Sequence, residues 1–480
     1  MSRSSGELEK DVGSEKVDER GGKERLGTYG IEKDGREAIE PTFAAHDDSP
    51  VDNEEHLEED DHVGAELEPV ASSKPSVNNI RSVPNGGLTA WLQVLVSFFL
   101  FFNTWGIVNT FGSYQTYYET GILSSSSPSD ISWIGSLQAT LLLLVGSLTG
   151  PIYDAGYVRT LVATGTFLCV FGQMMLSLST TYYQVLLSQA LCIGIGTGTM
   201  FIPGVAILST YFSTRIATAV GLAASGSSIG GIIYPIVFHN LQQSLGFPWA
   251  TRIIGFIMLA TLLLSNALLR IRVLPSQRRK ILDLPAWREL PFTFFVAGTF
   301  IGFLGLYTPF FYLQSYAIET HLTDPNTAFY LLSILNAAST FGRILPNLLA
   351  DRIGPFNVII PCTLLTGILC LCLIPTTSLA PVIVIAVLYG FFSGTFVSLP
   401  AAVYVSITKE RGLIGTRMGM GFAVTSFGIL FGTPICGAIL NASGGFADVW
   451  VFGGIMTVVA AALISVARVS KGGWGVRIWV

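Results

Sequence analysis

Charged residues are scarce in this 480-residue chain, where Asp, Glu, Lys and Arg make up 12% and hydrophobic residues 50%. Soluble globular domains carry roughly 25% charged residues, so this deficit excludes an ordinary soluble protein over most of the length. The acidic residues are also concentrated, because residues 1–87 hold 22 of the 32 acidic and 10 of the 27 basic residues. An acidic tail of net charge −12 is therefore followed by an apolar part with 10 acidic and 17 basic residues, of net charge +7.

The tail has few side chains that could form a core. Its most acidic stretch, Glu54–Asp61, contains one leucine and no aromatic residue. Such a segment cannot offset the conformational entropy lost on ordering. It also lacks a basic segment followed by an apolar core, which excludes a cleavable signal peptide. We expect residues 1–87 to be a disordered acidic tail in the cytosol, and an acidic arm that binds a partner protein is the alternative.

Cysteine is equally sparse, and several catalytic patterns are missing. All six cysteines fall inside apolar runs, so their positions predict neither disulfides nor a metal site. The sequence has no phosphate-binding Walker loop and no grouping of Ser, His and Asp that would suggest nucleophilic catalysis. We therefore expect no enzyme, no ATP drive, no cofactor and no nucleic-acid partner.

Long apolar stretches dominate the chain from Leu88 onward, separated by short polar breaks. Most are about twenty residues long, the length that an α-helix needs to cross ~30 Å of hydrocarbon. We expect an all-α membrane protein whose partner is the lipid bilayer. Its twelve predicted helices lie at 88–112, 132–152, 158–179, 184–208, 217–238, 249–271, 292–316, 327–349, 357–376, 381–405, 417–440 and 447–468.

Basic residues fall almost entirely on one side of these helices. If the tail is cytosolic, that side holds fifteen Lys and Arg residues and the opposite side holds Arg252 alone. This asymmetry predicts a multi-pass protein of the cell membrane with both termini in the cytosol. The fifteen are Arg159, Arg215, Arg270, Arg272, Arg278, Arg279, Lys280, Arg288, Arg352, Lys409, Arg411, Arg417, Arg468, Lys471 and Arg477.

A basic loop divides the helices six and six. Residues 272–291 form this cytosolic linker between an N-terminal half at 88–271 and a C-terminal half at 292–468, and 469–480 form a cytosolic C-terminus. Two six-helix halves joined in this way are typical of transporters whose halves rock about a site near the membrane midplane.

The loops after predicted helices 2 and 8 share a pattern of Gly, Asp and Arg. The first contains Asp154 and Arg159, and the second contains Asp351 and Arg352. A carboxylate near a helix end can pair with Arg and with backbone N–H groups, and so hold one conformation of a transporter until the pairs break. We predict that these four residues form a conformational latch, and ordinary Asp-Gly turns are the alternative.

This repeated pattern resembles the loop motif of the major facilitator superfamily. Two further segments resemble its monocarboxylate-porter branch, particularly the fungal members: Pro84–Gly87 leading into Trp91, and Tyr211–Arg215 entering the predicted fifth helix. The resemblance spans residues 84–470. It implies the major facilitator fold, with two pseudo-symmetric halves around a central substrate cavity.

Arg343 is the charge that lies deepest inside a predicted helix. Burying a charge in lipid costs at least ~2.5–3.5 kcal/mol, so such a residue usually faces a cavity or a partner. The guanidinium fork matches a carboxylate. By resemblance, Arg343 occupies the position of the arginine that binds the substrate carboxylate in monocarboxylate porters. We predict that it contacts the substrate, and a structural arginine bonded to helix-end carbonyls is the alternative.

Two positions depart from the mammalian monocarboxylate porters. Ser339 replaces an aspartate one turn before Arg343, and Asn109 stands where a lysine is expected. These departures argue against simple proton–lactate symport. Neutral polar side chains take their place, and for each of them hydrogen bonding between helices is the alternative to substrate binding. Those predicted to bind substrate with Arg343 are Asn103, Asn109, Asn336 and Tyr312.

The sequence as a whole predicts a secondary active transporter of a small organic solute, with a carboxylate among the candidates. We favour export of a metabolite or organic acid, such as a product of biosynthesis, because the charges that would relay a proton are missing. Import of a monocarboxylate or nutrient by proton symport is the alternative, and a non-transporting membrane sensor is a third possibility. Asn441 begins a glycosylation sequon in a predicted outward loop.

Overall fold

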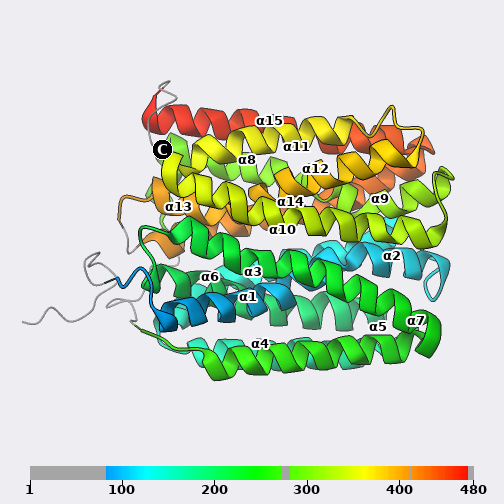
Figure 1. The fold of residues 1–480 in the computed structure, drawn as a ribbon, viewed down its shortest axis with the longest axis horizontal. Coiled ribbons are helices and arrows are strands. Elements are labelled where there is room, and N and C mark those ends of the chain that lie inside the picture. The colour runs from blue at the N-terminus through cyan, green and yellow to red at the C-terminus, as the bar shows by residue number, and fades with distance from the viewer. Residues whose placement is uncertain (1–82, 273–281, 411–412, 474–480) are drawn as a thin grey trace, which may run out of the picture. The chain divides into compact units, whose positions relative to one another are not determined.

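The computed structural model describes residues 83–272, 282–410 and 413–473. Nearly all of the predicted acidic tail at 1–87 lies outside these residues, as do residues 273–281 of the linker at 272–291 and most of the C-terminus at 469–480. The described part is helical throughout, and its helices run along one common direction (Figure 1).

The N-terminal half contains seven α-helices and one π-helix among the described residues. Their bounds are α1 Leu88–Asn109, α2 Phe111–Thr120, α3 Pro128–Asp154, α4 Val158–Leu176, α5 Tyr182–Val185, the π-helix η2 Leu186–Ile193, α6 Gly194–Tyr211 and α7 Ile216–Leu268.

The C-terminal half begins with a short 3₁₀-helix and continues with eight α-helices in the part that the structure describes. Their bounds are η3 Leu284–Arg288, α8 Leu290–Leu306, α9 Thr308–Glu319, α10 Pro325–Ile353, α11 Pro355–Leu371, α12 Leu379–Ser398, α13 Pro400–Ile407, α14 Ile414–Ser443 and α15 Phe446–Gly472.

The described residues account for the twelve predicted membrane spans. Ten helical stretches are long and apolar enough to cross a membrane. One of them, the 53-residue α7, contains two predicted spans, because its backbone leaves the helical conformation at Gly246. The φ of Gly246 is 77°, which residues with a Cβ rarely adopt. The twelfth span is the shorter apolar helix α11.

Three predicted spans are each built from two helices. The break between α8 and α9 falls at Tyr307 and that between α12 and α13 at Leu399, and a proline follows within two residues of each. Proline supplies no backbone N–H to continue the helix. At the third break, Thr110 between α1 and α2, the hydroxyl donates to the Gly106 carbonyl at 2.8 Å. The first span thus extends to Thr120, beyond the predicted end at residue 112.

The helix ends gather at two faces of the bundle (Figure 1). α1 begins and α15 ends at the same face, which we term the terminal face, and α6, α10 and α13 also end there. The opposite face, termed the far face, holds the turn at Gly246 and the ends of α2 and α9.

The two halves pack through two long helix pairs, α3 with α14 and α7 with α10. Within the N-terminal half, α1 packs closely along α7. A Cβ added at Gly230 of α7 would lie 3.0 Å from the Cα of Gly106 on α1. Small residues at such contacts let helix backbones approach in membranes.

Candidate substrate cavity between the two halves

A cavity in two adjoining parts lies between the halves. The outer part, termed the mouth chamber, has a volume of about 930 Å³ including the open space at its entrance. The inner part, termed the inner chamber, is smaller, at about 440 Å³ including the open space that it borders. Val205, Val220 and Ala401 line both, so the two chambers are adjacent.

The mouth chamber opens at the terminal face. Its walls come from the end of α6, the start of α7, α13 and the start of α14, all of which lie at that face. The residues that line it are Ile202, Val205, Ala206, Ser209, Phe212, Ser213, Ile216, Val220, Ala401, Ala402, Val405, Ile414, Gly415 and Met418.

The inner chamber is lined mostly by apolar side chains, five of them aromatic. Both halves contribute, through α1, α3, α6 and α7 on one side and α8, α12, α13 and α14 on the other. The lining residues are Phe101, Trp105, Leu143, Phe201, Val205, Val220, Ala224, Phe303, Val397, Ser398, Pro400, Ala401 and Phe422.

Trp105 joins the two halves through its ring contacts. Its indole is parallel to the Tyr307 ring within 3°, with centroids 6.2 Å apart, and stacks on Phe303 at 6.5 Å. Phe201 meets Trp105 edge-on at 6.1 Å and meets Phe422 of the other half at 5.6 Å. Such offset and edge-to-face contacts are favourable for aromatic pairs. The chamber therefore has an aromatic wall that spans the interface between the halves.

At the far face the two halves are in contact, so the cavity is closed on that side. The Tyr312 hydroxyl of α9 lies 3.0 Å from the Ser132 hydroxyl of α3 and donates to the Thr433 carbonyl of α14 at 2.9 Å. The rings of Phe111 and Phe311 are 5.2 Å apart across the same interface. Tyr312 thus lies in the contact that closes the far face and is not among the described residues that line either chamber.

Asp351 connects the end of α10 to the first turn of α7 in the other half. Its carboxylate accepts hydrogen bonds from the backbone N–H groups of Ala217 and Thr218, at 3.1 and 2.9 Å, and from the Thr218 hydroxyl at 2.6 Å. A carboxylate at a helix N-terminus is also stabilised by the helix dipole. Its neighbour Arg352 is exposed.

The other two predicted latch residues are at the end of α3 and the start of α4. Asp154 is buried as the last residue of α3. Arg159 is exposed and donates to the Leu269 carbonyl at 3.5 Å, within the N-terminal half.

Arg343 is 1% exposed and lies between α10 and α7. Its guanidinium donates to the Ser227 hydroxyl at 2.6 Å, to the Ala224 carbonyl at 3.3 Å and to the Ser339 hydroxyl at 3.3 Å. Ala224 lines the inner chamber, so Arg343 lies behind the chamber wall. With its neighbours on α10 it forms a row that we term the polar seam. The seam residues are Asn336, Ser339, Arg343 and Asn347, all buried.

The structure brings two of the three predicted asparagines together. A Cβ on Gly231 would lie 2.7 Å from Asn336 Oδ1 and 3.0 Å from Asn109 Cβ, so the two side chains approach the same position on α7. Asn103 lies apart and bonds Tyr234 and Thr261 within the N-terminal half, at 2.7 and 2.9 Å. Of these three, none is among the described residues that line either chamber. Asn441 is exposed in the last turn of α14.

The two segments that resemble monocarboxylate porters are in contact. The Asn85 side-chain carbonyl accepts from the backbone N–H groups of Ser213 and Thr214, at 2.7 and 3.0 Å, and from the Ser213 hydroxyl at 3.0 Å. Nearby, the rings of Trp91 and Phe212 are 5.2 Å apart. This contact, termed the Asn85 clasp, fixes the loop between α6 and α7, whose residues Phe212 and Ser213 line the mouth chamber.

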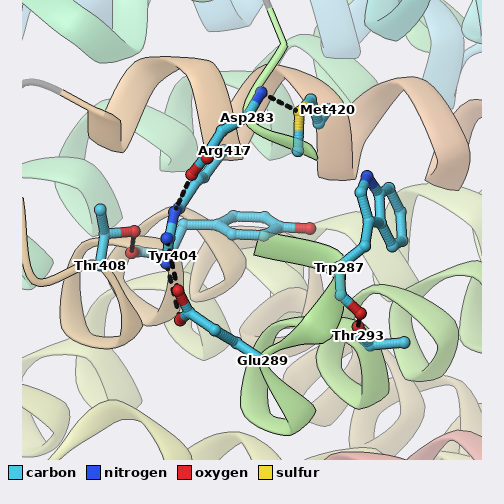
Figure 2. Close-up of polar contacts among 8 residues, drawn as sticks. All are labelled: Asp283, Trp287, Glu289, Thr293, Tyr404, Thr408, Arg417 and Met420. Atoms are coloured by element: carbon cyan, nitrogen blue, oxygen red, sulfur yellow. Dashed lines mark hydrogen bonds and ion pairs between the residues drawn. The ribbon is translucent and has the colours of Figure 1, made fainter. Parts of the chain in front are cut away.

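An ion-pair cluster joins the end of the linker to α14 (Figure 2). Arg417 donates to Asp283 at 2.8 Å and to both oxygens of Glu289 at 2.9 and 2.6 Å. The Asp283 backbone N–H also points to the Met420 sulfur at 3.1 Å. The described end of the linker is therefore tied to α14, one wall of the mouth chamber.

Sequence reasoning missed both the aromatic wall and this cluster. A weak signal was present in the first span, where Phe101 and Trp105 are four residues apart and so share one helix face. Aromatic spacing of this kind is equally expected of a packed core. The sequence favoured polar residues instead, and the structure places Arg343 and Asn336 in the polar seam, Tyr312 at the far face and Asn103 within the N-terminal half.

Two halves of six spans around one cavity, open at one face and closed at the other, define a transporter of the alternating-access class. The sequence profile of the Major Facilitator Superfamily matches residues 93–412. The chain belongs to the major facilitator superfamily.

Several similar proteins are fungal transporters. The chain is 52% identical to the MFS-type transporter dbaD of Emericella nidulans, over 80% of this chain and 87% of that one. It is 40% identical to the aspyridones efflux protein apdF of the same species, over 83% of this chain and 82% of that one. It is 39% identical to the fujikurins efflux protein of Gibberella fujikuroi, over 80% and 83%.

Solved structures share the fold. The nucleoside transporter NupG matches with a TM-score of 0.61 at 16% identity, covering 79% of this chain and 99% of its own. The E. coli fucose:proton symporter FucP matches with a TM-score of 0.58 at 17% identity, covering 79% and 98%. At these identities the likeness concerns the fold alone.

Proposed function

We propose that this protein is a secondary active transporter of the cell membrane that exports a small organic product of biosynthesis. The observation that carries the proposal is the apolar cavity between the halves, open at the terminal face and closed at the far face. Fungal relatives that are 39–40% identical carry efflux in their names, which supports export.

The direction of transport is outward if the terminal face, where the cavity opens, is cytosolic. Described basic residues gather there, whereas Arg252 lies beyond the turn at Gly246 towards the far face. An excess of Lys and Arg marks the cytosolic side of membrane proteins. In the conformation described, the cavity would then receive solute from the cytosol. The basic residues at the terminal face are Arg159, Arg215, Arg270, Arg272, Arg288, Arg352, Lys409, Arg417, Arg468 and Lys471.

Uptake of a small carboxylate is the second candidate function. Arg343 favours it, because its guanidinium bonds the carbonyl of Ala224, and Ala224 lines the inner chamber. The resemblance to the monocarboxylate-porter branch favours it as well. The hydrogen bonds of Arg343 to α7 would have to break before it could reach a solute.

The experiment is an untargeted comparison of metabolites in cells and medium, with and without the gene. We expect a compound that accumulates inside the deletion strain and falls in its medium, and this compound names the substrate. The control is the deletion strain with the intact gene restored at another locus, which should return both levels to normal. A compound left behind in the medium of the deletion strain alone would instead establish uptake.

A further inference from the structure

The inner chamber presents aromatic rings to its occupant from both halves. Phe201 belongs to α6 and Phe422 to α14, and their centroids are 5.6 Å apart across the interface. Phe201 also meets Phe101 edge-on at 5.8 Å, so it is held at a fixed angle by its neighbours. Ring faces carry negative and ring edges positive partial charge, and a wall that offers both matches another aromatic ring better than a saturated one.

No charged side chain is present among the described residues that line the two chambers. An ion that enters an apolar cavity loses its hydration without a partner, which is strongly unfavourable. Arg343, the cation that the sequence associated with substrate, is already engaged. It donates hydrogen bonds to Ser227, Ser339 and the Ala224 carbonyl. The cavity therefore disfavours a charged occupant.

The few hydroxyl groups in the lining are bonded within the protein. Ser398 accepts from the Asn347 amide at 2.7 Å and donates to the Thr395 carbonyl at 3.3 Å. At the mouth, Ser209 donates to the Ala206 carbonyl and Ser213 to Asn85. A strongly polar solute would lose hydrogen bonds to water and find few in return.

We infer that the transported solute is an uncharged, largely apolar compound with a flat aromatic ring system, held in the inner chamber by Trp105, Phe201 and Phe422. This inference rests on the proposed function, because it takes the cavity as the substrate site. Because Phe201 and Phe422 belong to different halves, such a solute touches both at once.

The test uses the full chain in lipid nanodiscs and three tritiated probes of similar size. Naphthol is aromatic and neutral at pH 7, naphthoate is aromatic and anionic, and decalol is neutral and saturated. Binding to empty nanodiscs is subtracted. We expect naphthol to bind more tightly than either of the other two. This comparison needs no variant, so it holds even if every substitution impairs folding.

The site is tested with Phe201→Leu and Phe422→Leu, which keep an apolar side chain but remove the ring. The loss of one favourable ring contact should weaken naphthol binding between about two-fold and about twelve-fold. The matched control is Phe167→Leu on α4, whose ring is 65% exposed on the outside of the bundle, and it should leave binding unchanged.

Three results would overturn the inference. The first is naphthoate binding that is as tight as naphthol binding or that depends on Arg343. The second is decalol binding that is as tight as naphthol binding. The third is an affinity for naphthol that Phe201→Leu leaves as unchanged as Phe167→Leu does. Failure of the proposed function would be recognised by a different result. If no compound accumulates in the deletion strain while naphthol still binds through the rings, export fails and the aromatic site stands.

Discussion

Arg343 shows at the scale of one residue how a buried charge can hold two halves together. Its guanidinium comes from α10 in the C-terminal half and bonds Ser227 and Ala224 on α7 in the N-terminal half. Hydrogen bonds that involve a charged group are stronger than neutral ones. In this conformation Arg343 is a tie between halves, and contact with a substrate carboxylate is the competing hypothesis.

A double-mutant cycle separates the two roles. We expect Arg343→Ala to lower the free energy of unfolding by about 1.5–3 kcal/mol, the usual value of a charged hydrogen bond. Ser227→Ala should then add little in the Arg343→Ala background, because its partner is already gone. Thermal unfolding in detergent gives the four values. If Arg343 instead binds a carboxylate, Arg343→Ala should abolish carboxylate uptake, Arg343→Lys should keep part of it, and Ser227 should show no coupling.

At the scale of elements, the end of α10 and the first turn of α7 form a contact that depends on one carboxylate. Asp351 accepts three hydrogen bonds there, two of them from backbone N–H groups. A helix N-terminus favours a negative charge over a neutral group by about 0.3–1 kcal/mol. The contact should therefore weaken, without disappearing, when the charge is removed.

We expect Asp351→Asn to expose the first turn of α7 more often. A cysteine placed at the buried Ala217, in a chain without its native cysteines, should react with maleimide up to about five-fold faster, the factor equivalent to 1 kcal/mol. Arg352→Ala is the control, because Arg352 is the adjacent residue and is exposed. Equal labelling in the two variants would show that Asp351 does not hold this contact.

The helices also show which features of the fold and of the cavity could be predicted from the sequence. Hydropathy and length place the spans, because lipid requires both. The breaks at Thr110 and Tyr307 escape prediction, because neighbouring helices decide whether a span bends. The cavity escapes for a similar reason, since a ring such as Trp105 has the same helical spacing whether it packs in a core or lines a chamber. The polar residues were found, but their hydrogen-bond partners are far away in sequence.

At the scale of the whole molecule, transport requires the far face to open while the terminal face closes. Tyr312 joins α9 of one half to α3 of the other through Ser132, and also bonds the Thr433 carbonyl of α14. Of the residues predicted to bind substrate, it is the one that lies in the closed interface. Its hydroxyl should therefore influence the balance between conformations more than the affinity for solute.

We expect Tyr312→Phe to favour conformations that are open at the far face. One net hydrogen bond of about 0.5–1.5 kcal/mol corresponds to a change of about two-fold to about twelve-fold in population. A cysteine at Ser129, whose hydroxyl donates to the Pro434 carbonyl across the same interface, reports opening to a membrane-impermeant thiol reagent. Tyr330→Phe on the exposed surface of α10 is the control. A labelling rate unchanged from the parent would remove Tyr312 from the closure.

The Asn85 clasp has a consequence for how the protein is made. Asn85 and Ser213 are 128 residues apart, and a ribosome that adds about 5–20 residues per second needs roughly 6–26 s to cover that distance. During this time the first span is already in the membrane while the loop that will hold its beginning does not yet exist. The loop between α6 and α7 can therefore take its final form only after four spans have been synthesised. A substitution at Asn85 should accordingly delay assembly of the nascent chain before it affects any step of transport.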